Sequence, residues 1–178
     1  LKLPSDADGT ILTTNTAVGK ILQCQSTTIT AASSSTISAG YYWNPDLKVS
    51  ITPNNSSNKI LVIGYAMTAV AGLQHNIGLQ IHRDGSSVTA YRGDAAGSRR
   101  RNAAVGTNIV STYSNFTAQI NFQYLDTAGQ TSAIEYGVSI QNPSSTSRTV
   151  YLNRAVTDTD DSSHYRTAST ITVMEVAA

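Results

Sequence analysis

The chain has 178 residues, of which 13% are charged and 40% are hydrophobic, and it contains 22 serines and 23 threonines. With only two glutamates and four lysines, it lacks the composition of a coiled coil or helix bundle. Abundant β-branched and aromatic residues exclude an intrinsically disordered chain, and the low glycine and proline content excludes collagen. The composition therefore predicts one globular, β-rich domain whose surface is polar through hydroxyl groups.

The charge balance and the cysteine count limit the partners of the chain. The formal net charge is +1, so no overall electrostatic field would attract nucleic acid or a membrane surface. A single cysteine, Cys24, excludes an intrachain disulfide and a cysteine-based metal cluster. No apolar run approaches the ~20 residues that a membrane-spanning helix needs. We therefore expect no nucleic-acid partner, no membrane insertion, no metal and no cofactor.

The chain begins with a segment that predicts an arm rather than a strand. Residues 1–18 have few core-forming side chains and several turn residues, such as Asp8 and Gly9. They are expected to form an extended N-terminal arm or linker. The remaining residues, 19–178, are expected to form a single domain.

Apolar residues then predict roughly eight to ten strands separated by polar turns. The expected strand segments, in order, are 21–24, 49–51, 60–70, 77–81, 116–124, 134–140, 150–152 and 171–174. The run 60–70 is apolar on both parities, which is typical of a strand covered on both faces. Residues 83–86 have the composition of a tight hairpin turn, whereas the hydroxyl-rich stretch 26–38 has almost no bulky side chains. The pattern favours an all-β fold, a single antiparallel β-sandwich or jelly roll.

Catalytic residue patterns are weak in this chain. Three histidines, His75, His82 and His164, occur among many serines, but no Gly-x-Ser-x-Gly nucleophile motif is present. Glu135 and Glu175 could serve as the paired carboxylates of a glycoside hydrolase, but both lie on expected strands and are interpreted as structural. His75 and His82 would lie on opposite faces of one strand and are not expected to chelate a metal together. The sequence therefore predicts a protein that is not an enzyme.

The densest acidic segment is a loop that contains Asp158, Asp160 and Asp161, followed by His164 and Tyr165. Carboxylates at this spacing can hold Ca²⁺, which prefers oxygen ligands. However, the order of acids and the distal glutamate of a calcium-binding loop are absent. A solvated loop without a metal is therefore the favoured interpretation.

A basic cluster, Arg99, Arg100 and Arg101, follows an Arg-Gly-Asp tripeptide at 92–94. Guanidinium groups match the oxygens of phosphate, sulfate or acidic polysaccharide. Two interpretations stay open: the arginines bind such an oxyanion, or they pair with acids across a subunit interface. The tripeptide by itself is equally typical of a turn.

Tyr41, Tyr42 and Trp43 form an aromatic cluster outside the expected strands and precede a turn at 44–46. Aromatic faces stack on sugar rings, so the cluster suits a glycan-binding surface. Alternatively, one or two of these side chains belong to the core.

Several strings along the chain resemble the C-terminal domains of bacteriophage tail fibres and related virion fibres, notably those of phages of cyanobacteria. The strings are KILQ at 20–23, SNKILV at 57–62, GDAAGSR at 93–99, FQYLD at 122–126, TVYLNR at 149–154 and TASTITVMEVAA at 167–178. The opening LPSDADG at 3–9 is similar to the segment that joins a fibre shaft to its terminal head.

This resemblance implies a homotrimeric head with a jelly-roll-like fold, exposed on the virion after synthesis in the cytoplasm of the bacterial host. It implies contact with other virion proteins through the N-terminal arm and, for such heads, binding of bacterial surface glycans. It also implies that GDAAGSR is a structural loop of the family rather than an integrin ligand. No catalytic residue carries over from the family.

The expected function is that of a non-enzymatic fibre head that attaches the particle to its host. The expected binding surfaces are loop tips, namely Tyr41 to Trp43, Arg99 to Arg101 and Asp158 to Tyr165. One alternative is a head-fibre, decoration or tail-tip protein with an assembly role only. Another is a fibre-borne glycan depolymerase, which would need paired acids in a groove.

Overall fold

The computed structural model of the chain describes residues 19–72, 76–106 and 115–178. The expected N-terminal arm, residues 1–18, lies outside the described residues, and so does His75. Across the three described ranges, no helix is long and apolar enough to cross a lipid bilayer.

The described residues form twelve strands and one short 3-10 helix, η1, so the all-β prediction is confirmed. In chain order the elements are β1 (Ile21–Ile29), β2 (Ser33–Ile37), β3 (Tyr42–Trp43), β4 (Lys48–Ile51), β5 (Lys59–Val70), β6 (Ile77–Arg83), β7 (Ser86–Ser87), η1 (Thr89–Tyr91), β8 (Ala104–Gly106), β9 (Ala118–Thr127), β10 (Ile134–Gln141), β11 (Arg148–Leu152) and β12 (Ser169–Val176).

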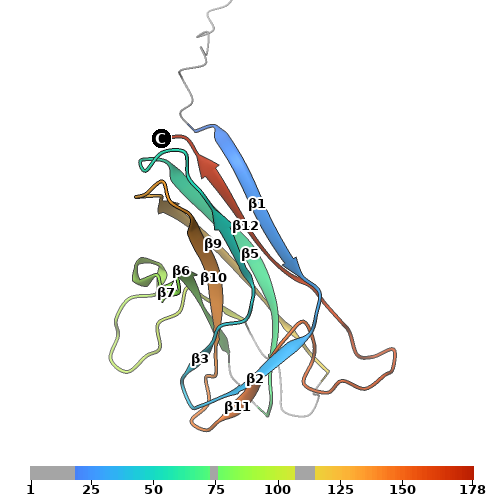
Figure 1. Cartoon of the computed structure of the whole chain (residues 1–178). Coiled ribbons are helices and arrows are strands. Elements are labelled where there is room, and N and C mark those ends of the chain that lie inside the picture. The colour runs from blue at the N-terminus through green and yellow to red at the C-terminus, as the bar shows by residue number, and fades with distance from the viewer. Residues whose placement is uncertain (1–18, 73–75, 107–114) are drawn as a thin grey trace, which may run out of the picture.

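The strands make two sheets, and every pairing between the named strands is antiparallel. Sheet A has the order β1-β12-β5-β11-β2, and β9 pairs with the other edge of β5. Sheet B has the order β3-β10-β6-β7, with β4 also paired to β10 and β8 to β6. The two sheets pack face to face around one core (Figure 1), which confirms the predicted antiparallel arrangement.

The core lies between the sheets, where alternate residues of each strand point inward. On β9 and β10 the inward, buried apolar positions are Ala118, Ile120, Phe122, Tyr124, Ile134, Tyr136, Val138 and Ile140. Gly64 of β5 lets the Phe122 side chain and the β12 backbone pack closely against β5. A Cβ there would lie 2.2 Å from the Thr170 carbonyl oxygen and 2.7 Å from the Phe122 ring. Burial of each large side chain in this core stabilises the fold by ~1.5–3 kcal/mol.

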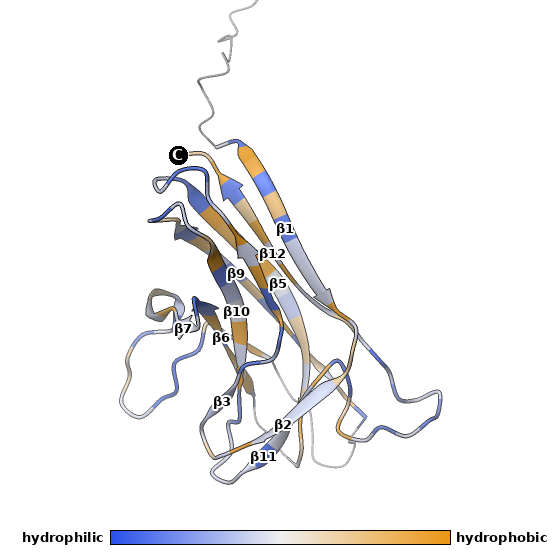
Figure 2. Cartoon of the chain, viewed as in Figure 1, coloured by the Kyte–Doolittle hydropathy of each residue, from blue (hydrophilic) through white to orange (hydrophobic). Residues whose placement is uncertain are grey.

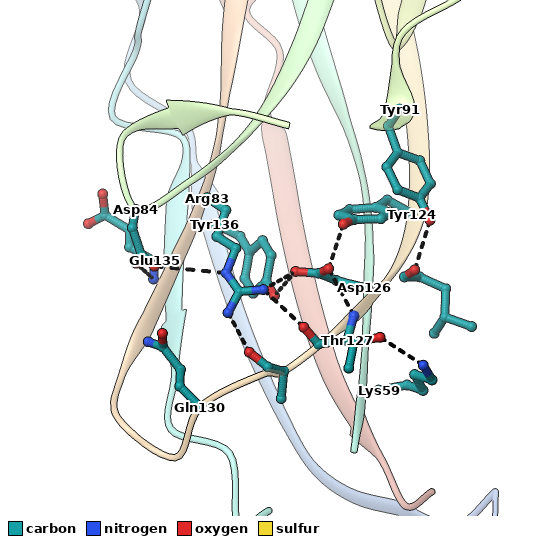
Figure 3. A network of polar contacts seen from close by, with 12 residues as sticks. Lys59, Arg83, Asp84, Tyr91, Tyr124, Asp126, Thr127, Gln130, Glu135 and Tyr136 are labelled. Carbon is teal, nitrogen blue, oxygen red and sulfur yellow. Dashed lines mark hydrogen bonds and ion pairs between the residues drawn. The ribbon is translucent and has the colours of Figure 1, made fainter. Parts of the chain in front are cut away.

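A carboxylate and a guanidinium tie the two sheets together across the core (Figure 3). Asp126 on β9 of sheet A lies 2.7 Å from Arg83 Nη1 on β6 of sheet B. The same carboxylate accepts the Tyr124 hydroxyl at 2.6 Å and the Tyr136 hydroxyl at 2.7 Å. Burial, together with the hydrogen bond to Asp126, raises the pKa of both tyrosines, so they remain protonated donors. Arg83 also donates to the backbone carbonyls of Thr127, the last residue of β9, and of Ala128, which follows it.

The hydroxyl-rich stretch 26–38 supplies strands that its apolar pattern did not predict. The first strand, expected at 21–24, continues to Ile29, and residues 33–37 form β2. Hydroxyl groups pair across neighbouring strands, namely Ser26 with Thr172 at 2.9 Å, Thr28 with Thr170 at 3.0 Å and Thr36 with Thr149 at 2.8 Å. Threonine is β-branched and favours strands, and cross-strand hydroxyl pairs stabilise them further.

Two other strand predictions need correction. β9 begins at Ala118 rather than at Phe116, whose side chain is 50% exposed. Most of β5 is buried on one face only: Ile60 belongs to the core, whereas Leu61 and Ile63 are partly exposed on the outer face of sheet A. At the end of the strand both faces are buried, because the consecutive residues Ala69 and Val70 are 0% and 2% exposed. The prediction that both faces of this strand are covered is therefore correct for residues 68–70 and wrong for residues 60–67 of the single chain.

Candidate ligand-binding surface

A long segment between β7 and β8, residues 88–103, contacts the outer face of sheet B through Arg101 and Asn102, and its Tyr91 packs on Tyr124 of β9. Two outward side chains of that sheet are nearly buried, Gln80 at 6% exposure and Gln141 at 3%. A Cβ at Gly78 would lie 2.3 Å from the Asn102 amide, so glycine lets this segment contact β6 directly. We call residues 88–103 the arginine loop, and in Figure 1 it extends from β6 and β7 to one side of the molecule.

Tyr42 is the centre of the hydrogen bonds that hold the arginine loop on the sheet. Its hydroxyl accepts from Gln80 Nε2 at 2.8 Å and donates to Asn102 Oδ1 at 2.8 Å. Asn102 Nδ2 donates in turn to Gln141 Oε1 at 3.0 Å. Gln80 Nε2 also donates to the Arg101 carbonyl oxygen at 3.0 Å. Burial raises the pKa of Tyr42 despite the nearby arginines, so the hydroxyl stays neutral and can make both bonds.

The predicted aromatic cluster separates into three different environments. Tyr41 is 69% exposed, whereas Tyr42 is occupied by the hydrogen bonds above. Trp43 is partly buried against the core, and it also lines a shallow hollow beside Asn44 and Pro45. Both interpretations made from the sequence therefore apply: Trp43 contributes to the core, and Tyr41 offers an exposed ring to the solvent.

Arg100 joins the arginine cluster to the aromatic segment. Its guanidinium lies over Gly40 and donates from Nη1 to the Asn142 carbonyl oxygen at 3.1 Å. A Cβ at Gly40 would lie 2.8 Å from Arg100 Nη1, and the φ of +78° at this position also favours glycine. Two of the three surfaces expected from the sequence, 41–43 and 99–101, are consequently adjacent.

The arginines of the loop have no carboxylate partner within the described part of the chain. Their hydrogen bonds go to backbone carbonyls or to a hydroxyl: Arg99 to Ala96 at 3.2 Å, Arg101 to Gly93 at 2.6 Å and Arg92 to Ser87 at 3.1 Å. The ion pairs between described residues all involve other side chains. The loop itself contains four arginines and a single acid, Asp94. Because a guanidinium carries several N–H donors, these contacts orient the groups and still leave donors for a ligand.

The third expected surface, Asp158 to Tyr165, lies on the other side of the molecule, in the connection between β11 and β12 (Figure 1). Asp158 is shared by two cations, with Arg154 Nη1 at 3.2 Å and Arg166 Nη2 at 2.6 Å. Asp160 is exposed, and the Tyr165 ring is 67% exposed. The structure thus does not bring this segment together with the arginine loop.

Asp161 is also engaged within the same connection. Its Oδ1 lies 2.8 Å from His164 Nδ1 and accepts the Ser163 backbone N–H at 2.8 Å. The bonds from His164 and Ser163 lower the pKa of Asp161 to about 2. Among the residues that the structure describes, no three His, Cys, Asp or Glu side chains converge as a metal site.

The two glutamates weighed as hydrolase acids occupy different environments. Glu175 on β12 is completely buried and accepts hydrogen bonds from Gln23 Nε2 at 2.6 Å, Asn58 Nδ2 at 2.6 Å and the Asn54 backbone N–H at 2.8 Å. Burial acts to raise the pKa of Glu175, but the hydrogen bonds outweigh it and the pKa lies below its ordinary value. Glu135 is partly exposed on the outer side of β10 and forms a 3.2 Å ion pair with Lys48. The two acids therefore line no common groove.

A serine and a histidine are also in contact on the outer face of sheet B. His82 Nε2 lies 2.9 Å from Ser139 Oγ, and His82 Nδ1 faces the Gly85 carbonyl oxygen at 3.3 Å. Burial lowers the pKa of His82. The Ser139 side chain is completely buried, and a carbonyl rather than a carboxylate contacts the second ring nitrogen. The pair links β6 to β10 and presents no accessible nucleophile.

Sequence reasoning missed the side chains that fix the arginine loop, Gln80, Asn102 and Gln141. One signal was available: the outward positions of β6 and β10 include amides, which can be buried when their hydrogen bonds are satisfied. Nothing in the sequence shows which loop satisfies them, because their partners lie 21 to 60 residues apart along the chain.

A scan against protein-family models finds none that matches this chain, and a search of curated proteins gives no match. Its function is therefore inferred from the geometry above together with the sequence strings that resemble fibre heads.

Proposed function

We propose that this chain is the head domain of a trimeric bacteriophage fibre and that its arginine loop binds anionic groups of a bacterial surface glycan. The proposal is supported by the strings that resemble fibre heads and by the hydroxyl-rich strands β1 and β2. The head would be made in the host cytoplasm and carried on the virion, where the segment 1–18 would join it to other virion proteins.

The strand order supports a jelly-roll fold for this head. The first strand, β1, pairs with the last strand, β12, and β5 lies between β12 and β9. In the second sheet β10 lies between β4 and β6. Neighbours that come from distant parts of the chain are typical of two interleaved Greek keys.

One observation carries the attachment function: one loop holds four arginines that have no carboxylate partner among the residues described by the structure. Guanidinium groups form paired hydrogen bonds with the oxygens of sulfate, phosphate and carboxylate groups. The hydrogen bonds of Tyr42 and Asn102 fix the loop before a ligand arrives, so less conformational entropy is lost on binding. Tyr41, whose ring is exposed and can stack on a sugar, directly follows Gly40, which the Arg100 guanidinium contacts.

A second candidate is an assembly role in a head fibre, a decoration protein or the tail tip. The same arginines favour it, because acids of a neighbouring virion protein would pair with them equally well. The depolymerase alternative gains no support, since Glu175 is buried and Glu135 faces outward with Lys48.

The proposed function is tested by measuring the binding of dextran sulfate to the immobilised chain, with neutral dextran as the reference. We expect binding of the sulfated polymer only, weakening as salt rises because exposed charges are screened. The triple variant Arg99→Gln, Arg100→Gln and Arg101→Gln is expected to lose most of this binding while keeping its circular dichroism spectrum.

The matched control removes the same number of positive charges elsewhere, at the exposed residues Lys20, Lys48 and Arg166. We expect this control to bind like the native chain, and equal weakening of both variants would contradict the assignment to the arginine loop. In a second assay, saturating chain should slow the adsorption of phage particles that carry it. Unchanged adsorption would favour the assembly role over attachment.

A further inference from the structure

The outer face of sheet A presents a continuous set of side chains across four strands. Strand register places these residues in rows that cross β1, β12, β5 and β9. The central row consists of Cys24, Met174, Leu61 and Leu125. The rows on either side add further apolar side chains, namely Ile21, Val176, Ile63, Tyr65 and Met67.

This face carries almost no charge. Among the outward residues of the four described strands, Lys59 at one end of β5 is the single charged side chain. The flanking positions are hydroxyls and amides, and the hydroxyls of β1 bond to those of β12. Because these hydroxyls already have partners on the same face, another protein surface can cover them without leaving them unsatisfied.

The apolar side chains of this face remain in contact with water in the single chain. Leu125 is 51% exposed and Ile21 is 54% exposed, while Leu61, Ile63 and Tyr65 are partly exposed. Figure 2 shows apolar residues following one another along β5, which gives the strand an apolar outer side as well as an apolar inner side. Removing such surface from water is favourable by ~25 cal/mol per Å².

We propose that the outer face of sheet A is where copies of this chain associate. Four strands spaced ~4.8 Å apart, each about ten residues long at ~3.3 Å per residue, give a face of roughly 600 Å². Stable interfaces bury about 800 Å² per partner, so the face is of the size that self-association requires. Identical copies also meet without like-charge repulsion, because the face is nearly uncharged.

The inference deepens the proposed function and rests on it only for the number of copies, which is three. Tyr91 of the arginine loop reaches β9 at the edge of sheet A, where its hydroxyl donates to the Leu125 carbonyl oxygen at 2.8 Å. The arginines of the loop lie away from the outer face of sheet A, on the side of β6 and β7 (Figure 1), so association through that face leaves them accessible. It also answers the question that the sequence left open for Arg99 to Arg101: these arginines would face outward rather than pair across a subunit interface.

Sedimentation equilibrium of the full chain at micromolar concentration tests this assignment. We expect the native chain to have three times the chain mass of 18.8 kDa. Leu125→Glu places a charge in the central row and is expected to give a species of single-chain mass. Leu125 is exposed and lies on the edge strand β9, so the variant chain keeps its own core. Val105→Glu, at a position on β8 that is 60% exposed, is the matched control and should keep the native mass.

Cys24 gives a second measurement that does not depend on a variant folding. It is the only cysteine, is exposed in the single chain and stands in the central row. Maleimide labelling in native buffer should be several-fold slower at high chain concentration than after dilution. A single-chain mass for the native protein, or labelling independent of concentration, would overturn the assignment. Binding of dextran sulfate is read separately, so either proposal can fail without the other.

Discussion

The two outer faces of the sandwich are built from the same alternation of inward and outward residues, but they differ in what covers them. On sheet B the outward residues Gln80, Ser139 and Gln141 are nearly or completely buried. On sheet A the outward residues Leu61 and Leu125 remain in contact with solvent.

The difference follows from the chemistry of the side chains. Buried amides need partners in fixed positions, so the chain itself supplies them through Asn102 and Tyr42. An apolar face has no such directional requirement and can be covered by any complementary surface, including another copy. The sandwich thus has one outer face that its own loop covers in part and one apolar outer face that we propose is covered by other copies of the chain.

The largest effect is expected at the contact that holds the two sheets together. Asp126→Ala leaves Arg83 without its carboxylate and removes the acceptor of two tyrosine hydroxyls. We expect the free energy of unfolding in urea to fall by about 2–3 kcal/mol, less than for a fully buried pair because the Arg83 side chain is 24% exposed. Asp126→Asn keeps the shape and one acceptor oxygen and should lose less. Equal stability of Asp126→Ala and the native chain would show that the sheets do not depend on this contact.

A smaller effect is expected where the arginine loop meets sheet B. Asn102→Ala removes the hydrogen bonds to Tyr42 and Gln141 and leaves buried polar atoms without partners, at a cost of ~1–3 kcal/mol. Because the loop is then less firmly held, trypsin should cleave faster after Arg99 to Arg101. Ser98→Ala, at an exposed position on the same loop, is the control and should leave the cleavage rate unchanged. If trypsin cleaves Asn102→Ala at the native rate, Asn102 does not hold the loop on sheet B, and the proposed difference between the outer faces of sheets A and B is contradicted.

The smallest effect is a pH dependence that arises inside sheet A. The pKa of Glu175 in the folded chain lies below the ordinary value of 4.5, which applies in the unfolded chain. The carboxylate therefore stabilises the fold above that value, and this contribution is lost as the pH falls through the folded pKa. In chemical denaturation between pH 7 and pH 3, the native chain should lose more stability than Glu175→Gln, which has no proton to take up. The same pH dependence in both proteins would contradict this origin.

The fold was predicted well where burial alternates along the chain and poorly where it does not. Alternation around Ile120 and Phe122 places β9, although its start is shifted from Phe116 to Ala118. The turn at 83–86 is confirmed by positive φ values of 49° at Asp84 and 75° at Gly85, as a tight hairpin requires. The strands of the stretch 26–38 were missed, because hydroxyl side chains stabilise them through partners on distant strands.

The candidate site was predicted in pieces and assembled only by the tertiary structure. Arg100 and Tyr41 could each be named from residue type, but their proximity depends on Gly40 and on Asn142 at the end of β10. The acidic loop at 158–165 was also named from residue type alone. However, it lies on the other side of the molecule, and its Asp158 pairs with Arg154 and Arg166.

By itself the sequence determined that this is an all-β chain with a hydroxyl-rich surface, because strand periodicity and side-chain polarity are local properties. The sequence also shows that β5 has apolar residues at both its odd and its even positions. Which of its faces joins the core, and which outer face receives the arginine loop, was decided by the tertiary structure alone. The reason is physical: strand register and loop docking depend on hydrogen bonds and packing between residues far apart in the chain.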